Sequence, residues 1–370
     1  MPREQVHWEI FESAARQLEA GGEENSAVGE ALARARAAGH LGAMAPDAPY
    51  YYRLGASSFV EVAERLHGTR GEDTLAFPRE LVRGALALPL SEARQARMAL
   101  AVGWVSHVAT DSIFHPAIFH LTGNYYDPDP EEQLRARRRH NAFEVFLDSW
   151  WEARISTPRK YTSMRSILRA MGRNLTWGLE ALGSAAIPQP RREPVSSAPA
   201  EPRGPFHGPG YRPPPDSSRR HPAALPLGED ASSLSQEWGR SLRHLSRLQT
   251  VFRSPMLGAA IHHLARIRPG MVGPLASLIA YGRRRADPYF DSPLEYRNPI
   301  SGESYTRSVE ELRGQAVAQT VEWTRLLFSD PDGVTPPGPS MDAGVPGSWN
   351  QDMKYFSATP PNFVDATLDY

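Results

Sequence analysis

The chain contains no cysteine among its 370 residues. This absence excludes disulfide scaffolds, thiolate zinc sites, iron–sulfur clusters and cysteine nucleophiles. Any metal ion bound by the protein must therefore be held by imidazole and carboxylate groups.

Long apolar runs and an excess of charge of one sign are also lacking. No stretch approaches 18 apolar residues without a charge, so no transmembrane span is expected. The N-terminal sequence lacks the apolar core of a signal peptide, which predicts a cytoplasmic protein. The formal net charge of −1 gives no electrostatic reason to expect a nucleic-acid partner. Nothing in the sequence indicates the oligomeric state.

Helical patterning dominates what is present. Apolar residues recur at three- and four-residue spacing through most of residues 6–186, whereas alternation typical of strands is hard to find. We therefore predict an all-α fold. Residues 188–226 carry 12 prolines and too little apolar surface to fold. The predicted organisation is a helical domain over 1–187, a disordered linker or loop over 188–228, a C-terminal helical region over 229–329 and an extended tail over 330–370.

Histidines and carboxylates recur at helical spacing in the first of these segments. His107, Asp111 and His115 are each four residues apart, and so are His140 and Glu144. Residues four apart share a helix face, and the outer two histidines lie roughly 12 Å apart along the axis. One ion cannot reach both of them with bonds of about 2 Å. The spacing therefore predicts a cluster of metal ions, with Asp111 able to bridge two of them.

Pro116 directly follows the last of these histidines. A residue that precedes proline is disfavoured in the α conformation. We therefore expect the helix to end or kink near His115, which would turn that side chain toward a second metal ion.

Further histidines and carboxylates lie upstream in a characteristic order. His7 lies in VHW, Asp47 in GAMAPD and His67 in ERLHG, followed by SHVATDSIFHP and HNAFE. This order of residue types, over roughly residues 5–150, resembles the zinc-dependent phospholipase C family, whose fold is similar to that of the P1/S1 nucleases. The resemblance implies that residues 1–187 form a multi-helix catalytic bundle, to which the C-terminal helices are an addition.

The resemblance also implies the metal ligands. One zinc ion would be bound by Asp47, His67, His107 and Asp111, and a second by His115, His140 and Glu144. A third would use His7, with Asp111 as the bridge. In secreted members of the family the third zinc is held by an N-terminal tryptophan, whereas Trp8 here follows His7 inside the chain. The resemblance therefore leaves two or three zinc ions open.

The expected function is that of a zinc-dependent phosphodiester hydrolase. Zinc-activated water would attack phosphorus, and Asp47 would act as the general base. The substrate class stays open between a phospholipid, a nucleic acid and a smaller diester. Five tyrosines beside these motifs would either line a substrate pocket or pack against helices and in loops: Tyr50, Tyr51, Tyr52, Tyr125 and Tyr126.

Other functions fit parts of the same pattern. The pairs Glu4–His7 and Glu64–His67 have the Glu-x-x-His spacing of di-iron bundles. A nuclease-type enzyme would use the same zinc ligands on another diester. A catalytically silent interaction protein could keep the metal ions for stability alone. A count of bound metal, together with a panel of diester substrates, separates these alternatives.

Overall fold

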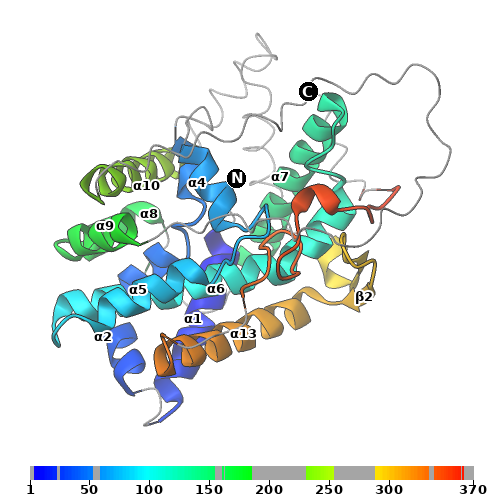
Figure 1. Ribbon diagram of the computed structural model, residues 1–370. Helices are drawn as coiled ribbons and strands as arrows, with labels where there is room; N and C mark the ends of the chain where they lie inside the picture. The colour runs from blue at the N-terminus through cyan, green and yellow to red at the C-terminus, as the bar shows by residue number, and fades with distance from the viewer. Residues whose placement is uncertain are drawn as a thin grey trace, which may run out of the picture.

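The computed structural model describes residues 4–22, 26–52, 59–154, 161, 163–185, 231–253, 288–332, 337–359 and 361. Within them the chain forms α-helices, one two-stranded sheet and short 3₁₀ helices (Figure 1). The α-helices are α1 Glu4–Ala20, α2 Ser26–Gly42, α3 Ala48–Tyr51, α4 Phe59–Leu66, α5 Ala76–Leu86, α6 Glu92–Thr122, α7 Pro130–Glu152, α8 Met164–Met171, α9 Asn174–Ser184, α10 Ala231–Arg253 and α13 Val309–Ser329. The 3₁₀ helices are η4 Pro288–Asp291 and η5 Asn350–Asp352.

The predicted helical fold with additional C-terminal helices is confirmed, and the small sheet is its one departure among the described residues. Strands β1 Leu294–Arg297 and β2 Ser304–Arg307 pair antiparallel. The predicted linker over 188–228 lies outside the described residues, and the domain boundaries stay predictions. None of the helices that the structure describes is long and apolar enough to cross a membrane.

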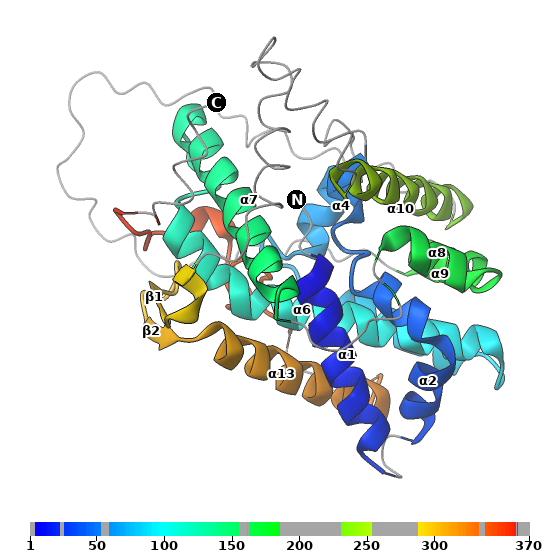
Figure 2. The same ribbon diagram turned by 180° about the vertical axis from the view of Figure 1, so that it is seen from behind.

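Helix α6 runs through the middle of the fold, with α1 and α13 beside it on the face seen in Figure 2. Its N-cap is Ser91, whose hydroxyl accepts a hydrogen bond from the Arg94 amide, and its C-cap is Gly123, with a φ of 101°. From Ala96 to Thr122 almost every residue is buried. A helix that is apolar on nearly all sides is typical of the centre of a large core. Polar side chains on such a helix are therefore held in fixed positions.

The expected end of this helix near His115 is not observed. Helix α6 continues through Pro116 to Thr122. Proline cannot donate to the carbonyl of Ser112 one turn earlier, which costs a free helix about 3 kcal/mol. Here the turn is enclosed by packing: a Cβ atom on Gly344 would lie only 2.4 Å from the Ser112 oxygen. Tertiary contacts thus outweigh the local preference and keep His115 on the same helix as Asp111.

Helices α2 and α6 cross so closely that their backbones touch. A Cβ atom on Gly103 of α6 would lie 1.9 Å from the carbonyl oxygen of Gly39. On the α2 side, a Cβ atom on Gly42 would lie 2.1 Å from the carbonyl oxygen of Leu100. Neither backbone can yield without moving a whole helix, so only glycine fits at these two positions.

Gly103→Ala is therefore expected to lower the free energy of unfolding by about 3 kcal/mol, the upper range for overpacking a core. The matched control is Gly84→Ala on α5, where an added Cβ meets no atom within 4 Å. In that open helical position alanine should stabilise by up to about 1 kcal/mol. Denaturant unfolding of both variants measures the difference. Equal stabilities would contradict the close crossing.

The last described stretch, residues 337–359, is called the C-terminal segment below; it lies across α6 and α7, in red tones in Figure 1. Its Met341 amide donates to the carbonyl oxygen of His67 at 2.9 Å, and its Ser357 amide donates to that of His120 at 2.7 Å. The Thr74 hydroxyl donates to the Pro339 carbonyl oxygen at 2.7 Å. This segment thus contacts α6 and the backbone of the predicted metal ligand His67.

Candidate metal centre

Helix α6 carries the centre of the site. His107, Asp111 and His115 follow one another at four-residue spacing along one face of this helix, and all three are buried. Around them stand His7 on α1, Asp47 at the start of α3, His67 just after α4, and His140 and Glu144 on α7. The structure therefore brings together side chains that are up to 137 positions apart in sequence.

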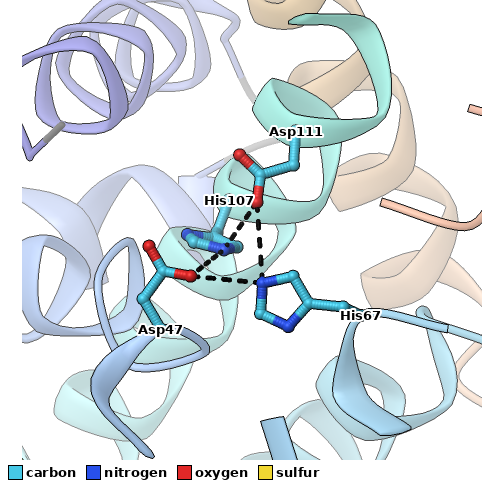
Figure 3. A group of neighbouring side chains, drawn as sticks. All are labelled: Asp47, His67, His107 and Asp111. Carbon is cyan, nitrogen blue, oxygen red and sulfur yellow. Dashed lines mark hydrogen bonds and ion pairs between the residues drawn. The ribbon is translucent and has the colours of Figure 1, made fainter. Parts of the chain in front are cut away.

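The first group of ligands consists of Asp47, His67, His107 and Asp111, shown in Figure 3. The Asp47 carboxylate oxygen Oδ1 lies 3.2 Å from His67 Nε2 and 3.6 Å from His107 Nε2. The Asp111 oxygen Oδ2 lies 3.0 Å from His107 Nε2 and 3.7 Å from His67 Nε2. Two nitrogens and two oxygens thus converge on one point, which is the donor set of a four-coordinate zinc site.

The second group consists of His115, His140 and Glu144. The Glu144 oxygen Oε1 lies 3.5 Å from Nε2 of His115 and 3.5 Å from Nε2 of His140. Three protein ligands leave a coordination position open, as catalytic zinc sites do.

Asp111 lies between the two groups. Its Oδ2 faces the first group, while its Oδ1 lies 3.8 Å from His115 Nε2 in the second. The same Oδ1 lies 3.3 Å from His7 Nε2. One oxygen thus faces the first group and the other lies near both His7 and His115, a position from which Asp111 could bridge two ions.

The ring nitrogens of the histidines are arranged for metal binding. Nδ1 of His67 bonds the Ala63 carbonyl oxygen at 2.7 Å, and Nδ1 of His107 bonds that of Ala43 at 2.9 Å. Since a carbonyl only accepts, each Nδ1 carries a proton, and in the neutral ring Nε2 keeps its lone pair. Nε2 of His107 is buried and faces the carboxylates of Asp111, at 3.0 Å, and Asp47, at 3.6 Å. A buried imidazole nitrogen that faces two carboxylates fits a zinc ligand.

The carboxylates dominate the electrostatics of the centre. Burial alone would lower the pKa of His107, but the charges of Asp111 and Asp47 raise it to about 9. Burial opposes ionisation of Asp111, yet the surrounding histidines hold the pKa of its carboxyl well below the usual range. Carboxylates that stabilise a proton on an imidazole also stabilise a divalent cation in its place, with the imidazole neutral.

His7 lies beside the first group but belongs to neither group. Its ring stacks on His107 at 4.3 Å between centroids, and its Nε2 lies 3.3 Å from Asp111 Oδ1. Burial, together with the charge of His107, lowers the pKa of His7 to about 4. The amides of Gln5 and Val6 contact the Asp148 carboxylate. The third zinc ion stays a prediction with two ligands, His7 and Asp111.

The di-iron alternative requires Glu4 and Glu64 in the centre. Among the residues that the structure describes, neither glutamate belongs to the two groups of potential metal ligands. Two of the tyrosines lie beside predicted ligands. Tyr50 lies 5.2 Å from His67 and Tyr125 lies 5.4 Å from His140, both measured between ring centroids, whereas Tyr52 is part of the main core.

One buried carboxylate in contact with the centre was not expected from the sequence. Asp342 lies in the C-terminal segment, and its Oδ1 lies 3.1 Å from His115 Nδ1. No motif signals this residue, because it is 227 positions away from its histidine.

A known protein family matches the part of the chain that carries the predicted metal ligands. Residues 6–180 match the family model described as zinc dependent phospholipase C. The chain carries a zinc-dependent phospholipase C domain. No curated protein and no solved structure matches the chain.

The eight predicted metal ligands, from His7 to Glu144, all lie within the zinc-dependent phospholipase C domain. The hairpin, α13 and the C-terminal segment lie beyond the matched residues. Asp342 therefore reaches the metal centre from a part of the chain that the family model does not cover.

Proposed function

We propose that the zinc-dependent phospholipase C domain binds two zinc ions and hydrolyses phosphodiesters. The first ion would be held by Asp47, His67, His107 and Asp111, and the second by His115, His140 and Glu144. The observation that carries this proposal is the position of Asp111, whose two oxygens face the two groups. Family membership supports zinc as the metal and diester hydrolysis as the reaction.

Zinc, when bound, lowers the pKa of a coordinated water toward 7 and neutralises negative charge on phosphoryl oxygens. The protein's own part is to hold neutral imidazoles at fixed positions and to accept a proton. Asp47 suits the second task, because its side chain is 18% exposed while His67, His107 and Asp111 are at most 4% exposed. The neighbouring histidines outweigh burial and lower the pKa of the Asp47 carboxyl, so it is ionised at neutral pH.

The proposed substrate class is a phosphodiester, and a phospholipid is favoured by the family alone. Tyr50 and Tyr125 stand next to ligands of the two groups and could contact the substituent of such a diester. A nuclease-type enzyme would use the same metal ligands and act on a nucleic-acid diester.

The experiment combines a zinc count with a panel of substrates on the full chain. We expect about two zinc ions per chain and turnover of at least one of bis-p-nitrophenyl phosphate, p-nitrophenyl phosphocholine and single-stranded DNA. Activity should disappear with a chelator and return with zinc. Two bound zinc ions with no turnover of any substrate would instead favour the silent, metal-stabilised alternative. Absence of zinc would overturn both.

A further inference from the structure

Asp342 contacts His115, a predicted ligand of the second group, at the ring nitrogen Nδ1. It is 5% exposed, and its Oδ1 lies 3.1 Å from Nδ1 of His115. The opposite ring nitrogen of His115, Nε2, faces Glu144 at 3.5 Å and Asp111 at 3.8 Å. Asp342 and the second group of ligands thus lie on opposite sides of one imidazole ring.

The Asp342 carboxylate is itself held in place on its other oxygen. The Tyr126 hydroxyl donates to Oδ2 at 2.7 Å, and the side-chain amide of Asn350 also donates to Oδ2. The backbone amide of Asp342 donates to the Ser340 hydroxyl oxygen at 3.3 Å. With Oδ2 accepting from two donors, Oδ1 is directed at the histidine.

The adjacent residue ties the same segment to the first group. The Met341 amide donates to the carbonyl oxygen of His67 at 2.9 Å. Two consecutive residues therefore contact one predicted ligand each, Met341 in the first group and Asp342 in the second. These two hydrogen bonds fix the position of the C-terminal segment relative to both groups.

The Nδ1 partner of His115 differs from those of His67 and His107. His67 and His107 donate Nδ1–H to backbone carbonyls of nearby helices. His115 bonds a carboxylate, which makes a stronger, charge-assisted hydrogen bond and increases the basicity of the opposite nitrogen. A metal ligand that donates its other N–H to a carboxylate is fixed in both tautomer and ring orientation.

We propose that Asp342 is a positioning residue for the second metal ion, acting through His115. It holds the proton on Nδ1 and presents the Nε2 lone pair to the metal, beside His140 and Glu144. The C-terminal segment is then a functional part of the metal centre, although it lies outside the matched residues 6–180. This inference rests on the proposed binding of two zinc ions.

The test measures zinc affinity in Asp342→Asn by competition with a chromophoric chelator. Removal of the charge is expected to lower the affinity for one of the two zinc ions by about 10- to 100-fold, the usual effect of losing a hydrogen-bond partner of a metal ligand. Affinity for the other ion should stay close to that of the wild type. Asp352→Asn, exposed in the same segment, is the matched control and should leave both affinities unchanged.

A second readout separates positioning from a structural role. The visible spectrum of the cobalt-substituted protein reports ligand geometry, and we expect it to change in Asp342→Asn and not in Asp352→Asn. Thermal unfolding of the metal-free variants shows whether the fold is kept. A folded Asp342→Asn protein with wild-type affinity at both sites and an unchanged cobalt spectrum would overturn the inference.

Wild-type protein provides a measurement that needs no change at Asp342. In the zinc-loaded protein, ¹⁵N NMR of the histidines should show His115 protonated at Nδ1, with His115→Gln used for the assignment. A proton on Nε2 would overturn the inference while leaving the zinc count intact. Wild-type protein that binds no zinc would overturn the proposed function itself.

Discussion

Asp111→Ala is expected to remove zinc from both groups and to lower diester hydrolysis by at least about 10³-fold, since metal ions contribute several kcal/mol of charge stabilisation. The reason is the position of the side chain. Its Oδ2 faces His67 and His107, and its Oδ1 faces the second group. Its contact with His115, at 3.8 Å, joins the two groups.

A graded series sharpens this test. Asp111→Asn keeps one oxygen and so can serve only one of the two groups. We expect it to retain more zinc than Asp111→Ala and less than the wild type, as measured by metal analysis after gel filtration. Asp352→Asn, which removes an exposed carboxylate, should retain both ions. Two zinc ions bound by a folded Asp111→Ala protein would contradict the bridging position.

His107→Ala and His140→Ala are expected to remove one zinc ion each, from different groups, and to abolish hydrolysis. Each variant leaves the other group's own ligands in place. Because the two ions would act on the same diester, loss of either should cost nearly as much turnover as loss of both. The measurement is zinc content and turnover of the two single variants and of the double variant.

The control for this pair is another histidine of α6. His120 lies outside both groups, and its Nδ1 bonds the Tyr355 carbonyl oxygen at 2.7 Å. His120→Ala should keep two zinc ions and wild-type turnover. Full zinc occupancy and unchanged hydrolysis in His107→Ala or His140→Ala would contradict the proposed function.

Much of the site follows from local spacing. His107, Asp111 and His115 share a face because residues four apart on one continuous helix must do so. The order of motifs from His7 to Glu144 predicted the remaining ligands, and the structure brings seven of these eight residues into two groups. His7 lies outside both groups and contacts His107 and Asp111, so its role as a ligand of a third zinc ion stays a prediction.

The remaining features depend on contacts between distant parts of the chain. The preference of a residue before proline predicted that α6 would end, whereas packing over Ser112 and Pro116 by Gly344 keeps it continuous. The hairpin has strands of four residues, too short for a clear alternating pattern. Asp342 has no local signal at all, because its role arises from a hydrogen bond across 227 positions.

The most direct test of two zinc ions in this domain is anomalous diffraction at the zinc absorption edge from crystals of the full chain grown with zinc. Two anomalous peaks are expected, one among Asp47, His67, His107 and Asp111 and one among His115, His140 and Glu144. Zinc-loaded crystals without a peak in either group would contradict the central claim.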